Sequence, residues 1–382
     1  MMNIGIFVSG YLPYHVYGIP RHVERLSAFL SSRGHKVWIF ARGERGLKTR
    51  SMQSDSVRVI RSRSPTLLKA SYSFFQVIVE IFFYTIYSLL IFPWIIRSEK
   101  IDLILGNGSW YGGWQATVCA FISRRPLVCT IHGYGIDYYN KRKSLPWMLR
   151  FLRKCEKIIV QRLSAVTTLQ GWEFSRSSIT YLDEGAVDTN KFAMGDSPAD
   201  ETKILFVGRL TNFKGPHLLI DALPEVIEYI DSSVVFVGDG EEKNKLIRRI
   251  AELDLQDKVE FVGQIEDVAP WYTRATIFVS LSPFNNYSDL ALMEAMSSGL
   301  AVIATNSGET SRLIIHNWNG ILIDSDPHQL ANAIVRVSKK RQKLNYLGRN
   351  ARKTIENDFS LSNWGTQMEK ILLEVHKTRK HS

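Results

Sequence analysis

Residues 204–215, ILFVGRLTNFKG, carry the clearest indication of the fold. Four apolar residues end at a glycine, and Gly215 then opens a helical pattern. A buried strand that leads through a glycine into a helix is the repeating unit of a parallel α/β sheet. Arg209 and Lys214 lie on the connecting loop, beside a helix start whose backbone N–H groups and dipole favour an anion. The stretch therefore predicts a diphosphate site, although a surface arginine and lysine on an ordinary loop would give the same pattern.

The same alternation of apolar strand and helix runs along all 382 residues. Continuous apolar strands between helices indicate parallel sheets covered on both faces, and two such sheets indicate two doubly wound domains. We therefore expect an α/β fold with two Rossmann-like domains that face each other across a cleft, at residues 1–190 and 191–360. Strands are predicted at residues 4–8, 37–40, 57–60, 101–105, 127–131 and 165–169, and at 204–207, 233–237, 259–262, 277–281, 301–304 and 320–323.

Charge divides the chain unequally. Residues 1–180 hold 25 Lys and Arg against 9 Asp and Glu, a net +16, whereas residues 181–382 have a net −5. This asymmetry indicates that the first half faces something anionic, such as lipid headgroups, a phosphate-bearing acceptor or nucleic acid. A basic surface that serves only solubility is the alternative. No nucleic-acid-binding motif accompanies the charge, so we expect no nucleic-acid partner.

Residues 74–96 form the most apolar segment. Its few polar residues recur every three or four positions, which predicts one narrow polar stripe on a helix: Ser73, Gln76, Glu80, Tyr84 and Ser88. Three interpretations remain open: a helix mostly buried against the sheet, a helix that also presents aromatic surface to a membrane, and a full span. Glu80 inside the segment and Pro93 near its end disfavour the span.

A second chemical signal is Glu294, within LALMEAMSSGLAVIA at residues 290–304. A carboxylate among apolar neighbours needs a partner, because an unpaired buried charge is costly. Two ribose hydroxyls would provide hydrogen bonds to it. A salt-bridging or capping role is the alternative interpretation.

In these two segments the chain resembles the large family 4 (group 1) of retaining glycosyltransferases, which has the GT-B fold. The resemblance covers nearly the whole length. It also rests on RHV at residues 21–23, RGHKV at 33–37, TIHG at 130–133, VDTNKF at 187–192, VGDG at 237–240 and VEFVG at 259–263.

The resemblance implies roles for individual residues. His132, Arg209 and Lys214 would be the catalytic set, with the two cations on the donor diphosphate and His132 near the reacting sugar. Glu294 would bind the donor ribose, and Gly263 and Gln264 would lie beside the base. The donor site implied in full is Gly18, Arg209, Lys214, Gly263, Gln264, Asn286, Ser288, Leu290 and Glu294. A terminal helix at residues 361–382 would cross back to the first domain.

The chain also departs from the family pattern. Asn286 stands where the family usually has a first glutamate, and Tyr17 replaces a glycine. Asn286 keeps hydrogen-bonding capacity but carries no charge. Asp289, at a position where glycine is common, would repel a diphosphate unless it points away or binds a sugar hydroxyl.

No cofactor and no metal ion are expected. Asp324-Ser325-Asp326 resembles a metal-binding Asp-x-Asp, but Asp326 followed by Pro327 fits a helix N-cap better. The three cysteines lack CxxC spacing and fit a reducing compartment. The N-terminus lacks the basic region of a signal peptide.

The predicted function is transfer of a hexose, with retention, from a UDP- or GDP-sugar to an acceptor hydroxyl. The expected acceptor is a lipid-linked or membrane-proximal glycan or glycolipid, and the expected location is the cytoplasm, at the inner face of the cytoplasmic membrane. The alternative is a catalytically silent homologue that binds a nucleotide sugar or an envelope partner. Asn286 and Asp289 motivate that alternative.

Overall fold

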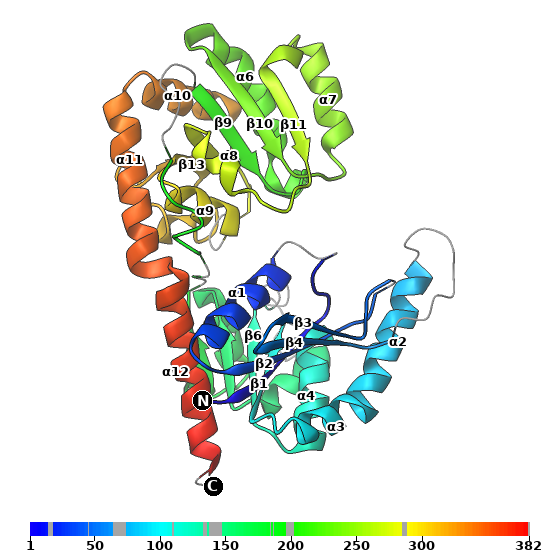
Figure 1. Ribbon diagram of the computed structural model, residues 1–382. Helices are drawn as coiled ribbons and strands as arrows, with labels where there is room; N and C mark the ends of the chain where they lie inside the picture. The colour runs from blue at the N-terminus through cyan, green and yellow to red at the C-terminus, as the bar shows by residue number, and fades with distance from the viewer. Residues whose placement is uncertain are drawn as a thin grey trace. The chain divides into compact units, whose positions relative to one another are not determined.

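The structure is a computed structural model, and it describes residues 1–13, 18–44, 46–63, 74–108, 111–132, 136, 147–183, 185, 187–195, 202–284 and 289–380. Contacts divide the chain into two compact units. Unit 1 comprises Met1–Ala186 and Trp364–Ser382, and unit 2 comprises Val187–Asn363. Each unit is a parallel α/β sheet with helices, as Figure 1 shows, which confirms the predicted fold class.

Unit 1 is built on a sheet with strand order β3-β4-β2-β1-β5-β6-β7-β8. All its described pairings are parallel except β3 with β4. Its strands are β1 (Asn3–Val8), β2 (Lys36–Ala41), β3 (Arg50–Ser54), β4 (Val57–Arg61), β5 (Leu103–Asn107), β6 (Leu127–Ile131), β7 (Lys157–Val160) and β8 (Ile179–Tyr181). Its helices are α1 (Ile19–Ser32), α2 (Phe74–Leu90), α3 (Phe92–Ser98), α4 (Tyr111–Ser123), α5 (Leu163–Gly171) and most of α12 (Leu361–Lys380).

Unit 2 has the strand order β11-β10-β9-β12-β13-β14, parallel throughout its described pairings. Its strands are β9 (Thr202–Val207), β10 (Ser232–Val237), β11 (Val259–Gly263), β12 (Ile277–Ser280), β13 (Ala301–Thr305) and β14 (Ile321–Ile323). Its helices are α6 (Pro216–Tyr229), α7 (Lys243–Glu252), α8 (Ala269–Thr273), α9 (Leu290–Ser297), α10 (Pro327–Ser338) and α11 (Arg341–Thr354).

One predicted strand is wrong. Residues 165–169 lie in helix α5, and the strand of this region is β7, whose sequence is KIIV. The run Val166-Thr167-Thr168 is typical of strands, but the two threonine hydroxyls donate to carbonyl oxygens four residues back, within the helix. Ala165, Val166 and Leu169 share its buried face, which is a helical spacing.

Helix α12 returns to unit 1 from Trp364 onward. Glu369 accepts hydrogen bonds from Arg33 at 3.1 Å and from His35 at 2.9 Å. His35 Nδ1 accepts from the Met2 backbone N–H, so its proton is on Nε2 and points at Glu369. Burial would raise the pKa of Glu369, but the hydrogen bonds from His35 and Arg33 outweigh it, and the pKa is lowered. The ionised carboxylate therefore ties α12 to α1 and β2.

The apolar segment 74–96 differs from the single helix that the sequence predicts. It forms α2 and α3, separated at Ile91. Within the described ranges no single helix is long and apolar enough to cross a membrane, whereas α2 from Ile78 and α3 meet that criterion only together, across a bend of 41°. Pro93 lies in the first turn of α3, where a proline without an N–H is tolerated.

The described part of the polar stripe of α2 faces inward; Ser73 and the side chain of Gln76 lie outside what the structure describes. Glu80, Tyr84 and Ser88 are buried, and Glu80 lies 3.4 Å from Arg42 in an ion pair. The Tyr84 hydroxyl donates to the backbone oxygen of Val8 at 3.1 Å. The opposite face is apolar and exposed; Phe82 is 60% exposed and Leu90 71% exposed. A surface helix of a water-soluble domain normally buries its apolar face and exposes its polar face, and α2 does the opposite.

Candidate active site

The diphosphate segment lies at the carboxyl end of the unit 2 sheet, where ligands of doubly wound folds bind. β9 ends at Val207, and α6 begins at Pro216. Gly215 takes φ +67, and a Cβ there would lie 2.2 Å from the Leu281 carbonyl oxygen, so only glycine fits. Gly238, after β10, comes equally close to Gly208: a Cβ would lie 2.0 Å from its carbonyl oxygen. These contacts fix the loop that carries Arg209 and Lys214.

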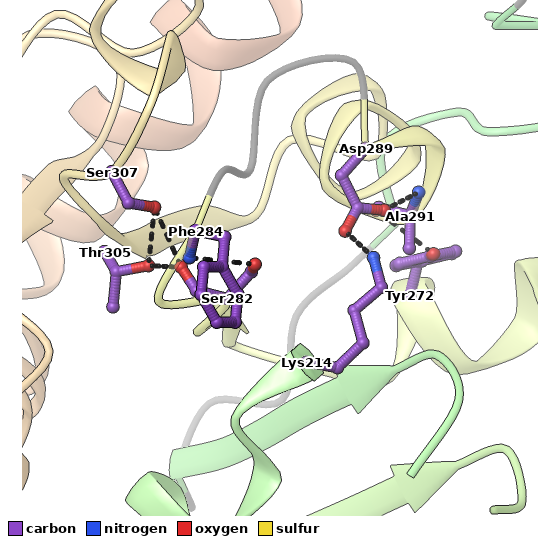
Figure 2. Close-up of polar contacts among 8 residues, drawn as sticks. All are labelled: Lys214, Tyr272, Ser282, Phe284, Asp289, Ala291, Thr305 and Ser307. Carbon is purple, nitrogen blue, oxygen red and sulfur yellow. Dashed lines mark hydrogen bonds and ion pairs between the residues drawn. The ribbon is translucent and has the colours of Figure 1, made fainter. Parts of the chain in front are cut away.

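Lys214 has a carboxylate partner. Its ammonium donates to Asp289 Oδ2, and the Asp289 Oδ1 accepts from the Ala291 backbone N–H at 3.1 Å (Figure 2). Asp289 is therefore the N-cap of α9, as well as the counter-charge of Lys214. The sequence predicted that Asp289 would repel a diphosphate, and the structure shows how it would compete with one. Its carboxylate pairs with the Lys214 ammonium and with one N–H at the start of α9, and a diphosphate would use both groups.

Arg209 differs from Lys214. Its side chain is exposed, and it has no hydrogen-bond partner among the residues that the structure describes. It directly follows Gly208 at the end of β9, with the Leu210 N–H bound to the Asp239 carbonyl oxygen at 2.9 Å. An exposed guanidinium on a fixed backbone keeps both its donor edges available to an anion.

Glu294 is only 5% exposed and lies in the middle of α9. The Tyr272 hydroxyl is 3.1 Å from Glu294 Oε2 and 3.2 Å from the Ala291 carbonyl oxygen. The sequence predicted that a buried carboxylate here needs a partner, and Tyr272 is one. Tyr272 comes from α8 and is fully buried. No sequence pattern singled it out, because a tyrosine in a short helix is an ordinary core residue.

The structure describes some of the remaining donor-site residues that were predicted in unit 2. Gly263 ends β11 with φ +80, and its carbonyl oxygen accepts from Gly238 N–H at 2.8 Å. Gln264 follows it and is exposed. Leu290 opens α9 and is partly buried. Asn286 and Ser288 lie outside the described residues.

Two features of this sheet end were missed by sequence reasoning. Phe213 and Phe284, 40% and 59% exposed, stack with ring centroids 5.1 Å apart. Beside them, Thr305 Oγ1 and Ser307 Oγ both donate to the Ser282 carbonyl oxygen, at 2.5 and 2.8 Å (Figure 2). The sequence could have indicated this contact, because Ser282 follows β12 and Thr305 ends β13, and these strands are neighbours in the sheet.

Unit 1 has its own polar cluster at the carboxyl end of its sheet. His132 follows β6, and its Nε2 lies 3.1 Å from Oδ1 of the buried Asn107, the last residue of β5. The His22 ring packs edge-on against the rings of His132 and Trp364, at 4.4 and 4.6 Å. Burial, together with the charge of Arg25, lowers the pKa of His22 to about 3, so it is neutral at physiological pH. Asn107 and His22 thus orient His132.

Gly18 lies at the start of α1 with φ +64, a backbone conformation that glycine adopts readily. Its carbonyl oxygen accepts from the His22 N–H at 3.1 Å. The glycine is exposed and faces open space where a side chain would stand. Its position at the start of α1 is therefore compatible with close approach of a ligand to the backbone.

Among the described residues, no three His, Cys, Asp or Glu side chains gather closely enough to hold a metal ion. Asp326 is the N-cap of α10, with its carboxylate accepting from the His328 N–H at 3.0 Å and Pro327 in the first turn. The capping interpretation of the Asp-x-Asp sequence is confirmed.

Comparison with known families identifies the chain. Residues 187–354 match the family model for glycosyl transferases group 1, and residues 16–181 match the model for glycosyltransferase family 4. The chain belongs to the family 4 (group 1) glycosyltransferases, with the GT-B fold.

Three relatives illustrate the sequence similarity. Spore coat protein SA of Bacillus subtilis is 32% identical over 187 residues, 46% of this chain and 49% of the relative, so the match spans about half of that protein. An Escherichia coli UDP-Gal:alpha-D-GlcNAc-diphosphoundecaprenol alpha-1,3-galactosyltransferase is 28% identical over 290 residues, 70% of this chain and 74% of the relative. Alpha-monoglucosyldiacylglycerol synthase of Streptococcus pneumoniae is 25% identical over 353 residues, 87% and 78%.

Solved structures agree on the fold. Sucrose-phosphate synthase from Thermosynechococcus elongatus superimposes with a TM-score of 0.78 at 22% identity, covering 99% of this chain and 100% of that one. Anabaena HepE, solved in complex with UDP and glucose, has a TM-score of 0.73 at 18% identity, covering 98% and 100%.

Proposed function

We propose that this glycosyltransferase moves a hexose from a UDP- or GDP-sugar to an acceptor hydroxyl, with retention and without a divalent metal. The observation that carries the donor assignment is the carboxyl end of the unit 2 sheet. There an exposed Arg209, a fixed Lys214 and the buried carboxylate of Glu294 follow neighbouring elements of one sheet. Two cations match a diphosphate, and one carboxylate matches a pair of ribose hydroxyls. HepE, solved with UDP and glucose, supports a nucleotide-sugar donor.

In the proposed reaction, the bond between the sugar C1 and the diphosphate oxygen breaks, and the diphosphate leaves with the electron pair. The acceptor oxygen forms a bond to C1 on the same face, and its proton goes to the departing phosphate oxygen. Charge develops on the leaving group, so fixed cations lower the barrier most. Arg209 and Lys214 supply that charge, and His132, oriented by Asn107, donates or accepts at a sugar hydroxyl.

We place the acceptor at a membrane, on the evidence of helix α2. Its outward side chains are apolar, and the only charged residue of the helix, Glu80, is buried and paired. An exposed apolar face, here Ile78, Phe82, Leu89 and Leu90, is typical of an interaction surface. The relatives named for diphosphoundecaprenol and diacylglycerol substrates support a lipid-linked or glycolipid acceptor. We propose the matching location, which is peripheral, at the inner face of the cytoplasmic membrane.

The Lys214–Asp289 ion pair favours one competing function, a catalytically silent homologue that binds an envelope partner. If Asp289 keeps the ammonium permanently, no cation but Arg209 serves the leaving group. An assay of the wild-type protein separates the two. It is incubated with UDP- and GDP-sugars and a lipid extract, and release of nucleoside diphosphate and labelled glycolipid are both followed. Release above the protein-free rate with one donor supports the transferase; neither hydrolysis nor transfer with any donor supports the silent homologue.

A further inference from the structure

Unit 1 has a cavity of about 910 Å³ at the end of its sheet opposite to His132. It is lined by Leu127, the first residue of β6, by Glu156 just before β7, and by the last turn of α4. His132 follows the other end of β6, and a strand of this length separates the two ends by roughly 13 Å. The cavity is therefore distinct from the proposed catalytic end of the unit.

Cations dominate the lining. Five basic side chains meet one acidic residue, Glu156, and they come from four places in the chain: Arg97, Arg124 with Arg125, Lys154 and Arg379. Arg379 pairs with Glu156 at 2.7 Å, and Arg97 donates to the Ile122 carbonyl oxygen. Arg124 and Lys154 are exposed, and no ion pair involves them among the described residues. Arg125 Nε is buried and has no hydrogen-bond partner there.

Structural needs account for only part of this charge. The C-terminal ends of α3 and α4 face the region, and each helix end carries about −0.5 of an elementary charge. Together with Glu156 they offset about two of the five cations. A surplus of about three positive charges remains around a cavity wide enough for a phosphate group. Arg124 occupies the left-handed position after α4, at φ +57, where asparagine or glycine would end the helix as well without the charge.

The cavity adjoins the apolar surface of the unit. Phe121 lines it and is 77% exposed. Trp94, 64% exposed, and Arg97 are three residues apart on α3 and so share a helix face. Helices α3 and α4 pack side by side (Figure 1). We call the exposed apolar side chains the α2–α4 ridge: Ile78, Phe82, Leu89, Leu90, Ile91, Trp94 and Phe121.

We propose that this cavity binds the phosphate of an anionic phospholipid headgroup while the α2–α4 ridge enters the acyl region beside it. The cations match the phosphate, and the aromatic rim matches the boundary between headgroups and acyl chains. A free phosphate has the same chemistry but gives no reason for Phe121 to be exposed at the rim or for Trp94 to be exposed on α3. The inference rests on the proposed membrane location and adds lipid selectivity to it. The cavity lies at the end of the unit 1 sheet opposite to His132, so it serves attachment.

The test is co-sedimentation of the full chain with two kinds of vesicle, phosphatidylcholine alone and phosphatidylcholine mixed with phosphatidylglycerol. The cavity variant is Arg124→Gln, Arg125→Gln and Lys154→Gln combined. A matched control removes three exposed cations of unit 2, Arg248→Gln, Arg336→Gln and Lys340→Gln, with the same change in net charge. A ridge variant combines Phe82→Ser and Trp94→Ser. Thermal melting and donor hydrolysis show that each variant is folded.

Wild type is expected to bind the mixed vesicles more tightly than the neutral ones, with the difference shrinking at high salt. The cavity variant should bind mixed vesicles about 100-fold more weakly, since each of the three removed cations is worth about fivefold near an anionic surface. Its binding to neutral vesicles and its donor hydrolysis should not change. The control should lose little, and the ridge variant should lose binding to both vesicles.

Three results would overturn the proposal. Equal loss in the control and the cavity variant would show that net charge alone acts. Unchanged binding of the cavity variant would show that the cavity is not used. Inorganic phosphate at constant ionic strength that protects the cavity arginines from phenylglyoxal, when mixed vesicles do not, would assign the cavity to a free anion. If wild type binds neither vesicle, the membrane location itself is wrong, whereas the donor chemistry is judged separately by hydrolysis.

Discussion

Helices α2 and α6 belong to two units built on the same plan, yet they present opposite faces to their surroundings. In α6, Leu219, Leu223 and Val226 are buried and Asp221 is exposed. In α2, Glu80 is buried and Phe82 is exposed. This difference indicates that the outer face of α6 is suited to water, whereas the outer face of α2 is suited to an apolar environment. The charge asymmetry, +16 against −5, follows the same division.

The largest expected difference between the two helices is in the stability cost of truncating one apolar side chain in each. Leu219→Ala in α6 should lower the free energy of unfolding by about 2–5 kcal/mol, because it leaves a cavity in a packed core. Phe82→Ala in α2 should change it by only about 0.5 kcal/mol, because that ring is exposed. Urea denaturation followed by circular dichroism measures both. A large loss of unfolding free energy in Phe82→Ala would mean that the Phe82 ring is packed, and it would contradict the exposed apolar face assigned to α2.

The donor chemistry of unit 2 is tested by Lys214→Ala. Loss of a fixed cation at the leaving group should reduce the transfer rate by about 100-fold to 1000-fold. Thermal melting should show an intact fold, since Lys214 is a partly exposed loop residue. Lys243→Ala, which removes another partly exposed lysine from unit 2, is the control and should retain activity. A Lys214→Ala enzyme with the wild-type rate would remove this residue from the proposed mechanism.

In unit 1, the neutral His22 makes stability depend on pH. Its pKa is about 3 in the folded chain and about 6.5 when unfolded, so below pH 6.5 protons bind the unfolded chain preferentially and stability falls as pH falls. Between pH 6.5 and 5 this one group removes roughly 2 kcal/mol. His22→Phe keeps ring packing against His132 and should flatten the slope by that amount in urea titrations. Equal slopes in both proteins would show that His22 is not buried as described.

The smallest effect concerns Asp289. Asp289→Asn keeps an oxygen to cap α9 but no longer neutralises Lys214. Affinity for the donor nucleotide should rise several-fold, about 1 kcal/mol, as expected when a charged competitor is removed from a partly exposed site. Isothermal titration of nucleoside diphosphate measures it. Weaker binding in Asp289→Asn would instead show that the carboxylate contacts the donor, for example at a sugar hydroxyl.

The fold was predictable where hydrophobic pattern and turn chemistry agree. Residues 204–215 carry a buried strand, a glycine that alone fits its position and a helix start, and all three appear as predicted. The strand predicted at residues 165–169 was wrong because their β-branched content favoured a strand. Their buried side chains have a helical spacing, and tertiary packing stabilised the helix.

The site was predictable to the extent that it is local in sequence. Lys214 and Glu294 were found from their own segments, but their partners Asp289 and Tyr272 come from other elements, and pairing across a fold has no short-range signal. The orientation of α2 could not be predicted for the same reason. The polar stripe was visible in the sequence, but which side faces the core depends on Arg42 and the Val8 carbonyl group, which are distant in sequence.

The central claim, that the carboxyl end of the unit 2 sheet holds a nucleotide diphosphate donor, is tested most directly by thermal shift. Wild type, Arg209→Ala and Glu294→Gln are melted with UDP, GDP, ADP and their sugar conjugates, without metal. At 100 times its dissociation constant, a ligand of the folded state stabilises by about 2.7 kcal/mol, which is readily measured. We expect a shift with one nucleotide that is lost in both variants. No shift with any nucleotide, or a shift unchanged in Arg209→Ala and Glu294→Gln, would contradict it.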